Sequence, residues 1–270
     1  MIWVGTSWKM NKSRAEARAY VSVLGKAAQS GRWPHIQPFV IPPFTALAEV
    51  AEILRDSGVM VGAQNVHWEP SGAWTGEISV VQVADAGAEI VEIGHSERRE
   101  FFNETDEMVR LKVAATLKQG LTPLLCVGEP GAVFASGESA EYIAAQVEAG
   151  LDGLSDDDRA EALIAYEPIW AIGEYGRPAA PEDIMRAFGV LHDRFGTSTK
   201  GLLYGGSISL TNAVPTLAVD HIDGLFIGRH AWDIDGFLAI LDEVQSWAAQ
   251  SVGAVTTDGE AGRRRSLGRQ

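Results

Sequence analysis

The chain has 270 residues, 46% hydrophobic and 21% charged, which is the balance of an ordinary globular protein whose core needs no disulfide or structural metal. Its formal net charge of -14 argues against nucleic-acid and anionic-membrane partners, because those surfaces are themselves polyanionic. The chain has one cysteine, Cys126, which excludes an intrachain disulfide and a cysteine-based zinc site. It has no long apolar run and no signal-peptide pattern, which predicts a soluble, cytoplasmic protein.

Eight short apolar or β-branched runs alternate with longer segments of helical periodicity. The runs are Ile2–Val4, Phe39–Ile41, Met60–Val61, Ile90–Ile93, Leu124–Val127, Leu163–Tyr166, Leu202–Tyr204 and Leu225–Ile227. Helical spacing is found at Ala17, Val21, Leu24 and Ala28, at Ile184, Phe188, Leu191 and Phe195, and at Phe237, Leu241, Val244 and Ala248. Eight such units predict an α/β fold, a single-domain (β/α)8 barrel of parallel strands, with an open doubly wound sheet as the alternative.

The domain limits follow from a change in composition near the C-terminus. Residues 1–250 are predicted to form the barrel, and residues 251–270 a disordered tail, because polar residues and three consecutive arginines, 263–265, replace the apolar pattern. A basic docking arm is the alternative interpretation of those arginines. The run Asp156-Asp157-Asp158 predicts a solvated loop or the start of a helix.

Polar residues follow several of the predicted strands, and the C-terminal ends of parallel barrel strands meet at one mouth. Lys9 follows the first strand, His95 the fourth and Glu167 the sixth, while glycine-containing segments, 205–207 and 228–229, follow the last two. Glycine lets a phosphate approach backbone N–H groups closely. Each residue alone has an ordinary structural interpretation, as a surface lysine, a hydrogen-bonding histidine or an ion-paired glutamate, but their joint placement indicates a site.

Seven segments then resemble, in order, the signature segments of the triosephosphate isomerase family over about residues 1–248. They are Ser7-Trp8-Lys9-Met10-Asn11, Ala63-Gln64-Asn65, Thr75-Gly76-Glu77-Ile78-Ser79, Gly94-His95-Ser96-Glu97-Arg98-Arg99, Cys126-Val127-Gly128-Glu129, Tyr166-Glu167-Pro168-Ile169-Trp170-Ala171-Ile172-Gly173 and Tyr204-Gly205-Gly206-Ser207. The resemblance implies a TIM barrel that isomerises a small phosphorylated sugar.

The resemblance also implies roles for the polar residues. Glu167 would be the base that removes a proton beside the carbonyl. His95, as a neutral imidazole, would polarise that carbonyl and move protons between the two oxygens, and Lys9 would counter the phosphate and the enediolate charge. Glu97 would lie near Lys9 and the histidine, and Cys126 would pack behind the base.

The same resemblance implies a phosphate site, a lid and a partner subunit. The substrate would be bound by Ser7, Lys9, Gly173, Ser207, Gly228 and Arg229, and the lid would be the segment 168–178. Gln64 to Glu77 would form the contact of a homodimer. The implied chemistry needs no cofactor, and no cluster of His, Asp and Glu has the spacing of metal ligands.

Departures from the glycolytic pattern indicate a change of substrate. Ser7 stands where the glycolytic enzyme usually has asparagine, Arg229 stands where it has a second glycine, and Trp68 and Trp74 are unusual in the third loop. These features resemble the L-erythrulose-1-phosphate isomerase branch of the family, which implies conversion of L-erythrulose 1-phosphate to D-erythrulose 4-phosphate in four-carbon polyol catabolism. The alternatives are the triose phosphate reaction of glycolysis and gluconeogenesis, and a non-catalytic barrel that binds a phosphosugar.

Overall fold

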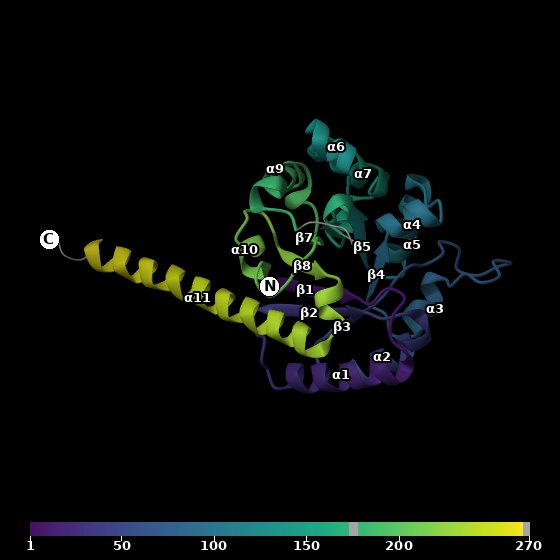
Figure 1. Ribbon diagram of the computed structural model, residues 1–270, viewed down its shortest axis with the longest axis horizontal. Coiled ribbons are helices and arrows are strands. Elements are labelled where there is room, and N and C mark those ends of the chain that lie inside the picture. Colours follow the sequence, from purple (N-terminus) through teal and green to yellow (C-terminus); the bar gives the residue numbers. More distant parts are fainter. Residues whose placement is uncertain (173–177, 267–270) are drawn as a thin grey trace.

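Eight parallel strands form a closed barrel, in which each strand pairs with the next along the chain and β8 pairs with β1 (Figure 1). The structure, a computed structural model, describes residues 1–172 and 178–266, with side chains as far as Ser251. The strands are β1 (Ile2–Ser7), β2 (Ile36–Ile41), β3 (Met60–Ala63), β4 (Ile90–Ile93), β5 (Thr122–Val127), β6 (Leu163–Tyr166), β7 (Gly201–Tyr204) and β8 (Gly224–Ile227). All eight predicted runs are strands, and the predicted (β/α)8 barrel is confirmed.

The helices lie outside the barrel, in the connections between successive strands and after β8 (Figure 1). They are α1 (Arg14–Gln29), α2 (Leu47–Leu54), α3 (Val80–Asp85), α4 (Ser96–Phe101), α5 (Asp106–Lys118), α6 (Gly131–Ser136), α7 (Ser139–Gly150), α8 (Asp156–Arg159), α9 (Pro181–Leu191), α10 (Ala213–Leu217) and α11 (Ile234–Ser266). Short 3-10 turns are η1 (Phe44–Ala46), η2 (Ile169–Ala171) and η4 (Arg229–Ala231), and η3 (His192–Gly196) is a π-helical turn. The predicted helical spacing is confirmed except at Phe195, which lies in η3, beyond the end of α9.

Local sequence explains where two of these helices begin. Ser13 and Glu16 form a capping box at the start of α1, in which each side chain satisfies a backbone N–H group of the other residue. The aspartate run opens α8, where the Ser155 side chain accepts the N–H of Asp158 at 3.1 Å. The helix start predicted for the three aspartates is therefore confirmed.

The strands carry two apolar layers because their side chains alternate between the two faces of the sheet. Outward-facing residues pack against the helices, and a smaller set fills the barrel interior. The interior set is Phe39, Ile41, Ile90, Leu124, Cys126, Leu163, Ala165, Leu203 and Phe226. Glu92 lies two positions after Ile90 on β4, so the same alternation points its carboxylate toward the barrel interior.

The last helix, α11, packs on the barrel and then continues away from it (Figure 1). Its buried residues include Phe237, Leu241, Val244 and Ala248, as the periodicity predicts. The helix runs past the predicted domain boundary at residue 250. The disorder predicted for residues 251–270 stays a prediction, and residues 267–270 lie outside the described residues. Among the helices that the structure describes, α11 included, none combines the length and apolar character needed to cross a membrane.

Candidate active site

A cavity of about 360 Å³ opens at the C-terminal ends of the strands. It is lined by residues that follow or belong to β1, β4, β6, β7 and β8, as expected for a parallel barrel. The predicted site residues that line it are Ser7, Lys9, His95, Glu97, Glu167, Ser207, Gly228 and Arg229. Cys126 is not among them and lies on β5, in the interior layer of the barrel, and Gly173 lies outside the described residues.

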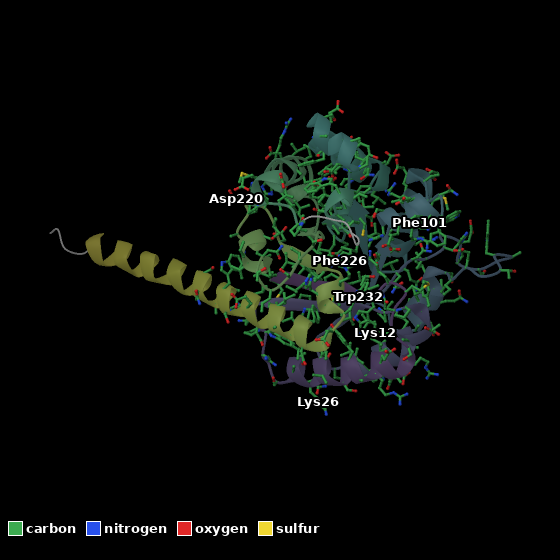
Figure 2. All side chains as sticks on the ribbon, in the orientation of Figure 1. Lys12, Lys26, Phe101, Asp220, Phe226 and Trp232 are labelled. Carbon is green, nitrogen blue, oxygen red and sulfur yellow. The ribbon has the colours of Figure 1, made fainter. Side chains whose placement is uncertain are left out.

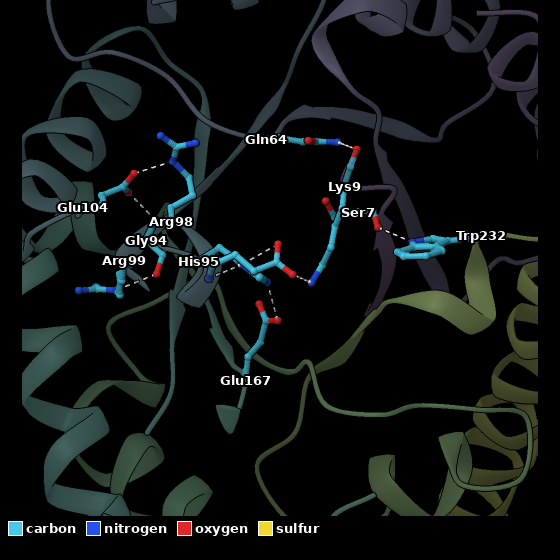
Figure 3. Close-up of polar contacts among 11 residues, drawn as sticks. Ser7, Lys9, Gln64, Gly94, His95, Arg98, Arg99, Glu104, Glu167 and Trp232 are labelled. Atoms are coloured by element: carbon cyan, nitrogen blue, oxygen red, sulfur yellow. Dashed lines mark hydrogen bonds and ion pairs between the residues drawn. The ribbon is translucent and has the colours of Figure 1, made fainter. Parts of the chain in front are cut away.

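Glu167 and His95 face each other in this cavity (Figure 3). Oε2 of Glu167 lies 3.4 Å from Nε2 of His95, and their side chains are only 8% and 5% exposed. The N–H of Glu167 donates to the carbonyl of Val127 at 2.7 Å, which fixes the residue just after β6. The neighbouring Gly128 must be a glycine, because a β-carbon there would lie 1.9 Å from the carbonyl oxygen of Glu167.

The protonation of His95 follows from its backbone contact. The N–H of Glu97, in the first turn of α4, donates to Nδ1 of His95 at 3.1 Å, so Nδ1 must keep a lone pair and the ring proton sits on Nε2, toward Glu167. Burial lowers the pKa of His95, while the carboxylates of Glu167 and Glu92 raise it, and the balance lies above the ordinary value. A second proton would nevertheless break the bond at Nδ1, so the geometry favours the neutral ring.

Lys9 reaches the same cavity from an unusual backbone conformation. Its φ is +52°, in the left-handed region that residues other than glycine rarely adopt and that is often found at functional sites. The side-chain amide of Gln64 donates to the carbonyl of Lys9 at 2.9 Å and holds this conformation (Figure 3). The strained backbone thus directs the ammonium group into the cavity, where its Nζ lies 2.6 Å from Oε1 of Glu97.

The Lys9–Glu97 pair keeps both groups charged. Burial lowers the pKa of Lys9, but the Glu97 carboxylate outweighs it and holds that pKa above the ordinary value. Burial raises the pKa of Glu97, but the ammonium of Lys9 outweighs it and holds that pKa below the ordinary value. Glu97 therefore lies beside both Lys9 and His95, where the family resemblance placed it.

The loops after β7 and β8 form the other side of the cavity. The hydroxyl of Ser207 donates to the carbonyl of Ala171 at 2.6 Å, which joins the loop after β7 to η2. Gly228 precedes η4. Arg229 is the first residue of η4, is exposed, and also lines the cavity. These residues lie together at the mouth, and their binding of phosphate stays a prediction.

Glu129 anchors the start of the segment predicted as the lid. Its Oε1 accepts hydrogen bonds from the hydroxyl of Tyr166 at 3.0 Å, the indole N–H of Trp170 at 2.8 Å and the hydroxyl of Ser139 at 3.0 Å. One buried carboxylate therefore fixes β6, η2 and the start of α7 relative to one another. Residues 173–177 of the predicted lid lie outside the described residues.

Cys126 lies where the resemblance placed it. It belongs to the interior layer on β5, is 1% exposed, and adjoins Glu167 in a small pocket beside the base. Burial, reinforced by the Glu167 carboxylate, holds the pKa of the thiol well above its ordinary value. The thiol is therefore a packing group and is poorly suited to act as a nucleophile.

A buried polar network beneath His95 was not identified from the sequence. Glu104 accepts from Arg98 at 2.7 Å, from Lys112 at 2.7 Å and from the N–H of Gly94 at 3.1 Å. Lys112 also donates to Asn65 at 2.8 Å. The network connects α5 to the turn that carries His95 and so fixes the position of that turn. The adjacent Gly94-His95 motif was visible in the sequence, but the partners come from distant segments.

Two further residues of the cavity were missed or given no role. Trp232 lines it and donates its indole N–H to the carbonyl of Ser7 at 2.9 Å, which joins η4 to the end of β1 (Figure 3). Glu92 also lines it, is 4% exposed, and has a pKa raised to about 7, chiefly by burial. The signal that could have found Glu92 is a lone acid within the apolar run of β4.

The cavity therefore combines a carboxylate, a neutral imidazole and an ammonium group with backbone-rich loops. Such a set can remove a proton from carbon and stabilise the oxyanion that forms. Among the residues whose side chains the structure describes, 1–172 and 178–251, no group of three His, Cys, Asp or Glu is placed to hold a metal ion. Fold and site together define the class: a (β/α)8-barrel enzyme with an acid–base site at the C-terminal mouth.

Comparison with known proteins identifies the family. A family model described as triosephosphate isomerase matches residues 2–244. The chain is 54% identical over 242 residues to an L-erythrulose-1-phosphate isomerase from Mycolicibacterium smegmatis, covering 89% of this chain and 92% of that protein. It is 52% identical over 248 residues to a protein of the same name from Brucella abortus biovar 1, covering 88% and 94%.

The structural comparison agrees. A crystal structure of triosephosphate isomerase from Bartonella henselae superposes with a TM-score of 0.78 at 31% identity, covering 90% of this chain and 99% of that one. The chain belongs to the triosephosphate isomerase family and is an isomerase of that family. The resemblance drawn from the seven segments is confirmed.

Proposed function

We propose that the protein converts L-erythrulose 1-phosphate to D-erythrulose 4-phosphate by proton transfer through an enediolate, without a cofactor. The observation that carries the proposal is the Glu167 carboxylate 3.4 Å from the His95 imidazole, in the same buried cavity as the Lys9 ammonium. The names of relatives that are 54% and 52% identical support the four-carbon substrate.

The proton transfers balance as follows. Glu167 takes the proton from C3, and the electron pair of that C–H bond forms a C2–C3 double bond as the C2 oxygen becomes negative. The Nε2–H of His95 and the ammonium of Lys9 stabilise this charge in a site with little water. The hydroxyl proton on the C3 oxygen passes to the C2 oxygen through the imidazole. Glu167 then returns its proton to C2, which leaves the ketone at C3 and no net change in atoms.

The remaining predicted residues bind the substrate in this proposal. The phosphate lies against Gly173, Ser207, Gly228 and Arg229, and Ser7 lies beside the reacting carbons. Exclusion of water by the segment 168–178 would protect the enediolate and strengthen the electrostatic contacts.

The proposal is tested by assaying the purified protein with L-erythrulose 1-phosphate and with dihydroxyacetone phosphate side by side, in deuterium oxide. We expect a higher kcat/KM for the four-carbon phosphate, and incorporation of deuterium at carbon during turnover. Glu167→Gln should abolish both turnover and exchange while binding persists. Glu107→Gln, at an exposed position on α5, is the matched control. Turnover of the triose phosphate alone would identify the glycolytic reaction, and binding without exchange would identify a non-catalytic barrel.

The proposal extends to assembly and location. A homodimer through Gln64 to Glu77 is supported by the loop between β3 and α3, which projects from the barrel (Figure 1). Trp74 in this loop is 49% exposed, and Phe101 on α4 is 66% exposed (Figure 2). A large exposed apolar group on a projecting loop is typical of an interface. A free buried thiol at Cys126 is in keeping with a reducing compartment, the cytoplasm.

A further inference from the structure

The floor of the active-site cavity holds two polar side chains that the proton transfers do not use. Ser7, at the end of β1, and Glu92, on β4, both line the cavity and are each 4% exposed. Within the part of the chain that the structure describes, the hydroxyl of Ser7 and Oε2 of Glu92 make no hydrogen bond of good geometry, although Ser7 lies close enough to Glu92 to lower its pKa. Buried polar groups are nearly always paired, so two unpaired ones facing the same cavity indicate a missing partner.

The surroundings of Glu92 make it a costly residue for the fold alone. Ile90 precedes it on the inner face of β4, and Leu124 lies beside it on β5, both fully buried. The two groups that could offset its charge, His95 and Lys9, are already engaged, His95 with Glu167 at 3.4 Å and Lys9 with Glu97 at 2.6 Å. A buried carboxylate that no cation holds directly destabilises a protein unless it is neutralised or bound, and burial, together with the nearby Glu167 carboxylate, has raised the pKa of Glu92 to about 7. Its presence at this position is therefore better explained by a ligand than by packing.

The position of Glu92 identifies which part of a substrate it would meet. The loops proposed to bind phosphate follow β7 and β8, and in the closed barrel β4 lies four strands from β8, on the opposite side. A substrate that places its phosphate at those loops and its reacting carbons between Glu167 and His95 directs its other end toward β4. In the four-carbon ketose this end is a hydroxymethyl group on the carbon that loses its proton. The three-carbon ketose has only hydrogen there.

We propose that Glu92 and Ser7 form a subsite that binds the terminal hydroxymethyl group of a four-carbon phosphoketose, and that Glu92 is the specificity-determining residue of this subsite. The inference rests on the proposed function and adds a residue to it. In the carboxylate form Glu92 accepts a hydrogen bond from the substrate hydroxyl, and the hydroxyl of Ser7 completes the contact. A site built to hydrogen-bond a substrate hydroxyl discriminates strongly against an analogue that lacks it, because the protein's own polar groups then stay unpaired.

The test compares three phosphates, L-erythrulose 1-phosphate, its 4-deoxy analogue 3-hydroxy-2-oxobutyl phosphate, and dihydroxyacetone phosphate. The unaltered enzyme is measured first. We expect kcat/KM for L-erythrulose 1-phosphate to exceed that for the deoxy analogue by about 10- to 100-fold, which is the effect expected from one hydrogen bond to a charged group. If the unaltered enzyme turns over only the triose phosphate, the proposed function fails before any variant is made.

Glu92→Leu then decides the inference. We expect it to abolish the preference for the hydroxyl over the deoxy analogue, so that the ratio of the two kcat/KM values falls to about one, whatever loss both substrates share through the effect of Glu92 on His95. An equal loss with all three phosphates, or a preference that survives, would overturn the proposal. Glu92→Gln retains the shape of the side chain and some hydrogen bonding, so its preference for the hydroxyl should be weakened by about 3- to 10-fold. This variant tests the proposal if Glu92→Leu does not fold. Glu100→Gln, exposed on α4, is the control.

Discussion

The side chain of Glu167 packs directly on the backbone of Gly205, where a β-carbon would lie 2.4 Å from Cγ of the glutamate. The end of β7 therefore offers only backbone beneath the proposed base. The position of the Glu167 carboxylate opposite His95 depends on the absence of a side chain at residue 205, a position that the sequence presents merely as part of a Gly-Gly-Ser turn.

Gly205→Ala should displace the base without unfolding the barrel. The added methyl group would push Glu167 away from its place by a fraction of an ångström or more, and small misplacements of a catalytic group can cost about 100-fold in rate. We expect a fall in kcat of roughly that size in the isomerase assay, with little change in Tm. Gly189→Ala on α9 is the matched control, because a β-carbon there meets nothing within 4 Å. Equal activity in the two variants would contradict this account.

Ser7→Asn should shift the substrate preference toward three carbons. Ser7 is buried at the floor of the cavity, and the longer asparagine side chain would occupy the space that a hydroxymethyl group needs. We expect the ratio of kcat/KM for L-erythrulose 1-phosphate to that for dihydroxyacetone phosphate to fall by about 10-fold or more. The comparison is internal to one enzyme preparation, so partial unfolding does not affect it. An unchanged ratio refutes the argument from space.

The titration of Glu92 should appear in the pH dependence of stability. Its pKa is about 7 in the folded protein against an ordinary value of 4.5, so the folded state binds more protons between those values and stability falls as the pH rises through this range. Glu92→Gln removes this penalty. We expect its advantage in free energy of unfolding to grow by roughly 2 to 3 kcal/mol between pH 5 and pH 8. Urea unfolding at constant protein concentration measures it, and an equal advantage at both pH values would show that Glu92 does not titrate there.

Trp74→Glu should weaken the proposed dimer. Trp74 packs against His67 in a tilted arrangement, with ring centroids 4.4 Å apart, yet it is 49% exposed on the projecting loop. A carboxylate in the apolar part of an interface has to be desolvated, so sedimentation velocity should show a shift toward monomer. Met185→Glu on α9, at a residue that is 55% exposed, controls for the charge. If the unaltered protein sediments as a monomer, the homodimer proposal fails.

Much of the fold was predictable because it is encoded locally. The apolar run Leu163–Tyr166 and the helical spacing of Phe237 and Leu241 each signal an element within a few residues, and eight repeats of that alternation predict a barrel. The end of β1 was less clear, since Gly5-Thr6-Ser7 is polar in composition although it continues the strand to Ser7. Closure of the barrel buries these residues, and a local pattern cannot show that burial.

The site was predictable to the extent that chemistry lies at strand ends. His95 and Glu167 follow strands, and strand order alone places them at one mouth. Glu92 lies inside a strand, where an acid is equally compatible with the solvent side of a half-exposed sheet, so its sequence position carried little information. Likewise, the support that Gln64 gives to the strained backbone of Lys9 joins segments that no spacing rule connects.

The sequence by itself therefore determined the eight β/α units, their order, and which strand ends carry acid, imidazole and ammonium groups, because these properties depend on periodicity and on neighbouring residues. Only the tertiary structure decided that Glu92 and Ser7 share the floor of one cavity and that Glu167 rests on Gly205. Distances between strands that are far apart in the chain are set by how the barrel closes and how its interior packs, and both depend on all the residues at once.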